Sequence, residues 1–292
     1  MSYNKKTSRQ FGWKPEWFGC SDFGDELEKA IASFQQDHNL YPDGMCGPDT
    51  FRRVFNERAL DLEEFDTDKE YSSYIICHGE PVDIEWDKVI LWTDVKGLQA
   101  KKGNYREVIG RRDVRMLVNH WDVCCSSKIC QRVLDKRGIS VHFLIDNDGT
   151  IYQTLDTTHV AWHASGANDF TIGVEISNAF YPKYQDWYVE KGFGERPILE
   201  KSVVHGKMLT DHLGFYPVQL KALKALFKAV NKGLRIPLET PLNLTGTQYT
   251  DRYSKAAKSQ YRGFVHHYHL TNKKIDCGGL DLSVLLEEIK NG

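Results

Sequence analysis

The segment 264–279 holds the densest group of reactive side chains in this 292-residue chain. Its sequence, FVHHYHLTNKKIDCGG, contains histidines, lysines, an aspartate and a cysteine. Thiolate and neutral imidazole are ligands that zinc prefers, and a catalytic zinc takes three protein ligands and keeps a fourth position for water. This segment can supply two of the three. We expect the third at the end of a strand far upstream, where His120 follows the apolar run 116–118.

The bulk composition excludes several classes of protein. The formal net charge is -2 and the basic residues are scattered, so no nucleic-acid partner is predicted. The cysteines, 7 in all, are unevenly spaced in a long chain, and we interpret them as mostly reduced thiols. The N-terminal residues lack a signal-peptide core, and there is no long apolar run. We therefore expect synthesis in the cytoplasm and no stable membrane association.

Two regions of different character are predicted. Apolar residues recur at helical spacing in 27–34, the stretch 41–44 interrupts the pattern, and 48–55 resumes it. This predicts a pair of short helices around a turn, which by itself could be a plain helical hairpin that caps a larger domain. The acidic stretch 57–71 is typical of a linker or a solvated helix.

The rest of the chain alternates between strand and helix patterns. Strands are predicted at 89–92, 116–118, 140–145 and 171–176, and the clearest helices at 218–230 and 280–289. Such alternation indicates an α/β domain built on one mixed β-sheet flanked by helices. We place the boundaries at 1–62 for a small all-α domain, 63–84 for a linker and 85–292 for the larger domain.

Two further features have alternative interpretations. Glu175 lies inside the apolar strand pattern IGVEI, where a carboxylate is costly unless it has a partner or a function. It is either a structural, salt-bridged glutamate or a reactive group. The aromatic-rich segment 178–196 is either a surface loop that packs on itself or an insertion that lines a substrate groove.

The N-terminal region resembles the peptidoglycan-binding domain family. The matching features are Phe34-Gln35, Asp43-Gly44, Gly47-Pro48 and Thr50, which opens the last helix. The resemblance covers about forty to fifty residues, and it implies a module that binds the bacterial cell wall.

The larger region resembles the zinc-dependent N-acetylmuramoyl-L-alanine amidase family, which includes the animal peptidoglycan recognition proteins. Five motifs occur in the family's order: VNHWD at 118–122, ISVHFLIDNDGTIYQ at 139–153, VAWHAS at 160–165, TIGVEISN at 171–178 and HYHLTNKKIDCGG at 267–279. Together with the wall-binding module, the chain resembles a modular bacteriophage endolysin.

The resemblance implies a role for each matching residue. The zinc ligands it implies are His120, His267 and Cys277, with Asp276 as the alternative third ligand. Glu175 corresponds to the general base, and Lys274, or else Lys273, to the cation near the oxyanion. The residues expected to contact substrate are Trp162, His163 and Asn178.

The function implied is zinc-dependent hydrolysis of the amide bond between N-acetylmuramic acid and L-alanine in peptidoglycan. We expect a monomer that accumulates in a host cytoplasm and reaches the wall after the membrane is permeabilised. Two alternatives are a non-catalytic peptidoglycan-binding protein and an amidase of soluble muropeptides in wall recycling.

Overall fold

The computed structural model describes residues 3–60 and 69–292. The N-terminal part is helical: α1 (Tyr3–Phe11), α2 (Asp25–Asp37) and α3 (Pro48–Ala59). The pair of helices predicted within 25–55 is confirmed by α2 and α3. Pro48 begins α3, a position where its missing N–H costs no helical hydrogen bond.

A six-stranded mixed sheet forms the centre of the larger domain, in the order β14-β5-β9-β6-β7-β3. Only the β6–β7 pair is antiparallel. The predicted α/β class with one mixed sheet is confirmed. The strands of this sheet are β3 (Val89–Leu91), β5 (Met116–Trp121), β6 (Phe143–Ile145), β7 (Ile151–Gln153), β9 (Thr171–Ile176) and β14 (Gly263–His266).

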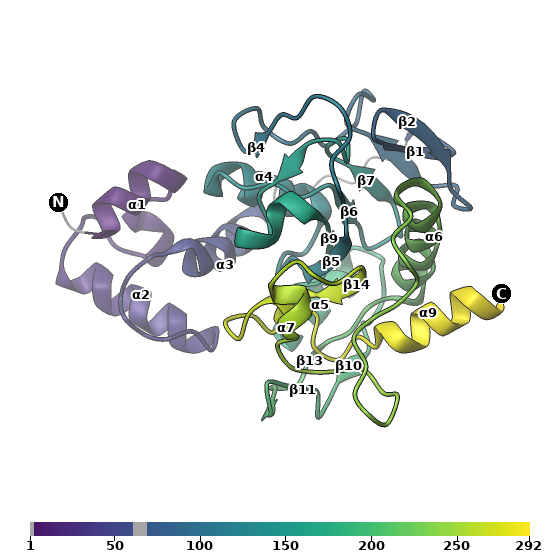
Figure 1. Cartoon of the computed structure of the whole chain (residues 1–292). Helices are drawn as coiled ribbons and strands as arrows, with labels where there is room; N and C mark the ends of the chain where they lie inside the picture. Colours follow the sequence, from purple (N-terminus) through teal and green to yellow (C-terminus); the bar gives the residue numbers. More distant parts are fainter. Residues whose placement is uncertain (1–2, 61–68) are drawn as a thin grey trace.

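Helices cover both faces of this sheet, which explains why β5 and β9 are apolar along most of their length rather than alternating. The longest helices here are α4 (Ser127–Arg137), α6 (Pro217–Leu234) and α9 (Leu282–Asn291). Figure 1 shows α6 on one side of the sheet and α4, with the N-terminal helices beyond it, on the other.

Short elements complete the larger domain. They are β1 (Tyr74–Cys77), β2 (Glu80–Asp83), β4 (Tyr105–Arg106), β8 (Val160–Ala161), β10 (Ile198–Leu199), β11 (Val203–Val204), β12 (Lys207–Met208), β13 (His212–Leu213), α5 (Gln185–Glu190), α7 (Ser254–Ala257) and α8 (His267–Leu270). Within the described residues, no helix is both long and apolar enough to span a membrane.

The hairpin β1–β2 corrects part of the expected linker at 63–84, because it packs against α6. The approach is close: a Cβ on Gly233 of α6 would lie 2.9 Å from the Cys77 sulfur and from a Val82 methyl. Residues 74–83 thus belong to the larger domain. Residues 61–68, which include most of the expected acidic linker, lie outside the described part of the chain.

The N-terminal helices and the larger domain share one hydrophobic core. Phe51 of α3 and Leu134 of α4 belong to the same buried cluster. Polar contacts add to it: the Cys125 amide donates to Asn56 Oδ1 at 2.8 Å, and the Tyr181 hydroxyl donates to the His38 carbonyl at 2.6 Å. The N-terminal helices are therefore packed onto the larger domain through buried contacts, and α3 can contribute to a site there.

Candidate active site

The candidate catalytic groups meet where three parallel strands end. His120 of β5 lies in register with Glu175 of β9. On the other side of β5, β14 ends at His266, and His267 begins the short helix α8. The carboxyl ends of parallel strands form one edge of the sheet, so residues more than a hundred positions apart are brought together there.

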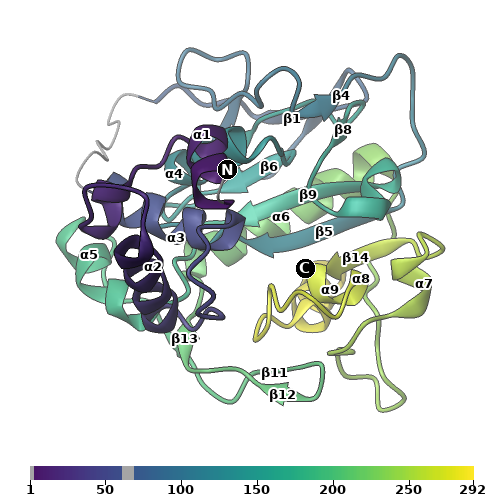
Figure 2. The same ribbon diagram turned by 90° about the vertical axis from the view of Figure 1, so that its left-hand side faces the viewer.

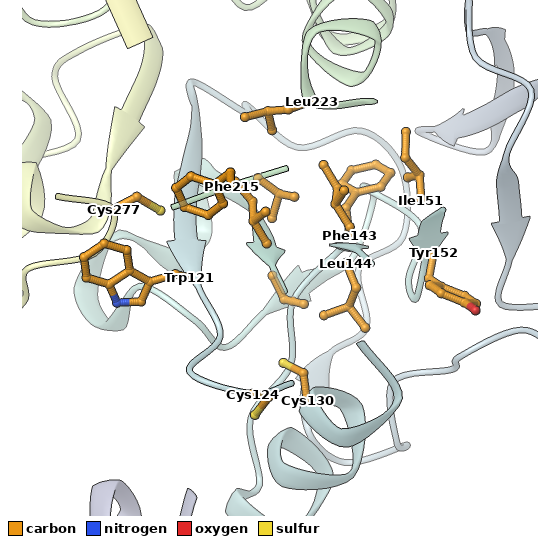
Figure 3. Close-up of a cluster of buried hydrophobic side chains, with 14 of the residues drawn as sticks. Trp121, Cys124, Cys130, Phe143, Leu144, Ile151, Tyr152, Phe215, Leu223 and Cys277 are labelled. Atoms are coloured by element: carbon orange, nitrogen blue, oxygen red, sulfur yellow. The ribbon is translucent and has the colours of Figure 1, made fainter. Parts of the chain in front are cut away.

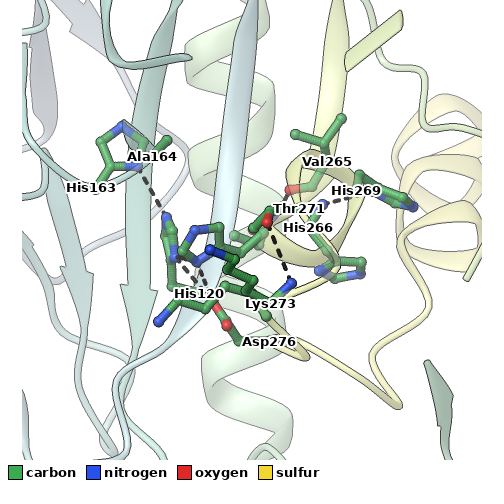
Figure 4. A network of polar contacts seen from close by, with 12 residues as sticks. His120, His163, Ala164, Val265, His266, His269, Thr271, Lys273 and Asp276 are labelled. Atoms are coloured by element: carbon green, nitrogen blue, oxygen red, sulfur yellow. Dashed lines mark hydrogen bonds and ion pairs between the residues drawn. The ribbon is translucent and has the colours of Figure 1, made fainter. Parts of the chain in front are cut away.

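Three ligand atoms converge at this edge. His120 Nδ1 lies 3.0 Å from His267 Nδ1 and 3.1 Å from Asp276 Oδ2, and His267 Nδ1 lies 3.0 Å from the same carboxylate oxygen. Figure 4 shows His120 beside Asp276, with His163 on the opposite side of the His120 ring. His120 and Asp276 are buried, and His267 is half-buried.

A chain of hydrogen bonds fixes the tautomer of His120. The Thr171 hydroxyl donates to the Ala167 carbonyl at 3.1 Å, so it accepts from His163 Nε2 at 3.2 Å. His163 Nδ1 is then an acceptor for His120 Nε2–H, at 3.0 Å. As a result, His120 Nδ1 presents a lone pair to the Asp276 carboxylate. Neighbouring groups commonly hold a metal-ligating histidine in this way.

The electrostatics of the cluster favour a bound cation. Burial and the nearby His267 lower the pKa of His120 to about 4, so its imidazole is neutral at neutral pH. Burial opposes ionisation of Asp276, but the contact with His267 holds its pKa well below the ordinary range. A carboxylate and an imidazole lone pair that face each other across 3.1 Å need a positive charge between them.

The donor set fits zinc. Zinc bonds to imidazole nitrogen and carboxylate oxygen at about 2.0–2.2 Å, so one ion can contact three atoms that lie 3.0–3.1 Å apart. Three protein ligands leave a fourth tetrahedral position open, as in catalytic rather than structural zinc sites.

The structure corrects the expected role of Cys277. Its side chain is fully buried in the hydrophobic core, and Figure 3 shows it in that cluster with Trp121 and Phe215. Burial raises the pKa of its thiol well above the ordinary value. Asp276, the alternative third ligand, instead has its carboxylate beside the two imidazoles.

Glu175 is buried beside this cluster. Its Oε2 atom has no hydrogen-bond partner among the described residues, so the interpretation as a salt-bridged structural glutamate is not supported at this atom. Burial raises its pKa to about 8, although the nearby positive charge of Arg52 acts in the opposite direction. A buried, incompletely paired carboxyl with a raised pKa is typical of a group that exchanges protons in a reaction.

A cavity of about 320 Å³ opens above these groups, lined by His120, Glu175, His267 and Asp276. Trp162 and His163 also line it, as expected for residues that contact substrate. Lys274 lines both this cavity and its neighbour, whereas Lys273 lines only the neighbour. This placement favours Lys274 as the cation near the reacting groups.

Asn178 lies outside this cavity, contrary to expectation. It is fully buried, its Nδ2 donates to the carbonyls of Leu213 and Gly214, and its Oδ1 accepts from the Phe180 amide. These contacts occupy the side chain on both sides, so Asn178 fixes the chain after β9 rather than contacting substrate.

Two arginines that sequence reasoning missed also line the cavity: Arg52 from α3 and Arg137 from the last turn of α4. Neither lies in one of the quoted motifs. Arg52 comes from the N-terminal module, and only the packing of α3 against the larger domain places it near β5 and β9.

Comparisons with known proteins agree with this architecture. Residues 110–278 match the N-acetylmuramoyl-L-alanine amidase family model, and residues 19–54 match a peptidoglycan binding domain model. No curated protein matches the chain at a significant level.

Several solved structures resemble the chain at low identity. An endolysin amidase, LysCS from Clostridium intestinale URNW, is 14% identical with a TM-score of 0.40, over 70% of this chain and 95% of its own. The Ph2119 endolysin of a Thermus scotoductus bacteriophage is 17% identical with a TM-score of 0.38, over 69% and 98%. AmpDh3 from Pseudomonas aeruginosa, in complex with anhydromuramic pentapeptide, is 18% identical with a TM-score of 0.40, over 65% of each chain.

Proposed function

We propose that this chain, which belongs to the N-acetylmuramoyl-L-alanine amidase family, is a zinc-dependent hydrolase of the amide bond between N-acetylmuramic acid and L-alanine in peptidoglycan. The observation that carries the proposal is the convergence of His120, His267 and Asp276 beside the incompletely paired carboxyl of Glu175.

In the proposed site, His120, His267 and Asp276 hold the zinc. When bound, the ion supplies an acidified water and polarises the substrate carbonyl. His163 keeps the His120 lone pair directed at the ion, through the hydrogen bond between His120 Nε2 and His163 Nδ1.

Glu175 is the proposed general base. Its carboxyl lines the same cavity as the ligands and has an oxygen free to accept a proton. Burial, only partly offset by the nearby positive charges, raises its pKa to about 8, and a cation at the ligand cluster favours its ionised form. After accepting a proton, Glu175 can deliver it to the leaving amine of L-alanine.

Lys274 is the proposed electrostatic partner of the oxyanion. Lys274 lines the cavity with Glu175 and Asp276, where positive charge stabilises the negative oxygen of a tetrahedral intermediate. Trp162 lies at the rim with 37% of its surface exposed, so its indole face is available to stack on a sugar or a peptide plane.

The proposed setting is lysis of a bacterial host. The amidase domain cuts the wall, and the N-terminal module supplies affinity for the polymer, which raises the local substrate concentration. Expression in a bacterial cytoplasm should leave cells intact until the membrane is permeabilised, and lysis should then follow within minutes. Lysis at the same rate in cells that express the Glu175→Gln variant would contradict this role.

The test of the chemistry uses purified sacculi, with and without a chelator. New free amino termini that appear only without chelator, and return when zinc is restored, are the expected result. New reducing sugar ends would instead identify a glycosidase. Absence of both products from zinc-loaded, folded protein would leave only a binding function.

A further inference from the structure

Two arginines in the wall of the catalytic cavity have buried nitrogen atoms without hydrogen-bond partners in the described part of the chain. The Nε atom of Arg52 and the Nε and Nη1 atoms of Arg137 are buried without a partner among the described residues. A buried donor with no acceptor costs roughly 1–3 kcal/mol, and more when it is charged. An arrangement of this kind indicates that an acceptor enters the cavity from outside.

Charged groups of both signs surround the two arginines. Burial and the positive charge of Arg52 lower the pKa of Arg137 to about 10. Lys274 lines the same cavity, and the opposing carboxylates are Glu175, Asp276 and the exposed Asp49. None of these carboxylates accepts a hydrogen bond from Arg52 Nε or from Arg137 Nε and Nη1.

We propose that Arg52 and Arg137 form a subsite for a carboxylate of the peptide portion of the substrate. The identity of the substrate rests on the proposed function, because a stem peptide attached to the muramoyl group enters the same cavity as the bond to be cut. Carboxylate is the ligand that a guanidinium binds best in a fixed, often bidentate geometry.

The subsite is shared between the two parts of the chain. Arg52 belongs to α3 of the wall-binding module, and Arg137 to α4 of the larger domain. Figure 2 shows α3 on the side of the sheet to which β5 and β9 point. The module is therefore part of the substrate site itself as well as an anchor on the wall, and the active cavity is incomplete without it.

The test compares two ligands of the full-length protein: an N-acetylmuramoyl pentapeptide with free carboxylates, and the same compound with every carboxylate converted to an amide. Binding is followed by tryptophan fluorescence in chelator, so nothing is hydrolysed, and Trp121 and Trp162 in the cavity wall report it. We expect the wild type to prefer the carboxylate form by at least about tenfold.

Arg52→Gln and Arg137→Gln should each reduce that preference to less than about threefold by weakening only the carboxylate form. Arg58→Gln, on an exposed position of the same helix, is the matched control and should keep the preference. Equal binding of both forms by the wild type would overturn the inference. An equal loss of affinity for both compounds in the Arg52 and Arg137 variants would also overturn the inference. The role of the arginines would then be to stabilise the charge of Glu175.

Amidase activity is measured separately on the wild type with zinc and the free-carboxylate compound. A carboxylate preference without release of free amino termini would refute the proposed function and keep the subsite. Release of free amino termini without a carboxylate preference would support the proposed function and refute the subsite. Circular dichroism verifies that each variant is folded. Because the two arginines lie on different helices, the second variant still tests the subsite if the first one misfolds.

Discussion

The substitution Gly173→Ala tests whether His163 controls the metal site. Gly173 lies in the middle of β9, and a Cβ there would meet the His163 ring at 2.6 Å from Nδ1, 2.8 Å from Cε1 and 2.9 Å from Cγ. The backbone of Gly173 is not in the left-handed region, so alanine is tolerated by the chain itself. The three nearest atoms all belong to the imidazole, which must move.

The size of the movement follows from these contacts. Ordinary van der Waals contact begins near 3.4 Å, so Nδ1 must retreat by about 0.8 Å from a Cβ at 2.6 Å. The hydrogen bond from His120 Nε2 to His163 Nδ1 is 3.0 Å long and tolerates a change of only a few tenths of an ångström. Its loss releases the His120 tautomer, and loss of such a partner costs roughly 10–100-fold in metal affinity.

The assay is zinc competition against a chromophoric chelator, together with thermal unfolding of the chelated protein. Gly166→Ala is the matched control, because a Cβ at Gly166 meets no atom within 4 Å. It should bind zinc like the wild type. The double variant Gly173→Ala, His163→Ala removes the clash, so it should recover the stability of His163→Ala but not the zinc affinity. Wild-type zinc affinity in Gly173→Ala would refute the link from His163 to His120.

Three further predictions concern the ligands, the base and the module. Asp276→Asn should lower zinc affinity by more than about 100-fold. Cys277→Ser should keep zinc affinity and lose about 1–3 kcal/mol of stability, because it places a hydroxyl in the core. Zinc competition and urea unfolding measure the two effects, and loss of zinc binding in Cys277→Ser would make Cys277 the third ligand instead of Asp276. Glu175→Gln should retain zinc but lower kcat on sacculi by roughly 10²–10⁴-fold, and near-normal kcat would remove Glu175 as the base. Burial acts to raise the pKa of Glu57, but hydrogen bonds from His38 and Lys183 outweigh burial and lower this pKa to about 2. The ionised Glu57 carboxylate therefore stabilises the fold fully above its ordinary pKa, and this stabilisation is lost as the pH falls through about 2. The free energy of unfolding of the wild type should therefore fall more between pH 6 and pH 3 than that of Glu57→Gln, and parallel curves would show that this contact contributes nothing.

Hydrophobic patterns in the sequence predicted the strands and helices whose burial is visible in their own residues. The apolar run that forms β9 is visible because both faces of the strand are buried, and the helical stripe of α6 because one face is. The hairpin at 74–83 was missed because two four-residue strands lie within a polar region, and their stability comes from packing against α6.

The site was predicted to the level of the segment but not of the ligand. Asp276 and Cys277 are neighbours in an irregular loop, and both residue types bind zinc, so composition cannot separate them. The fold separates them by directing the carboxylate to the imidazoles and the thiol into the core. Asn178 illustrates the same limit, since a polar residue beside a catalytic strand can equally serve the backbone.

Arg52 shows most clearly what a sequence read segment by segment leaves out. Its own helix has an ordinary amphipathic pattern, and the residue lies 123 positions from Glu175. Nevertheless, the packing of α3 against α4 and the hydrogen bond from the Cys125 amide to Asn56 place Arg52 in the cavity wall. A module that shares its core with the enzyme it accompanies cannot move freely from it, so wall attachment and the position of Arg52 are fixed by the same contacts. Substitutions that loosen this interface should therefore affect the hydrolysis of small muropeptides as well as attachment to the wall.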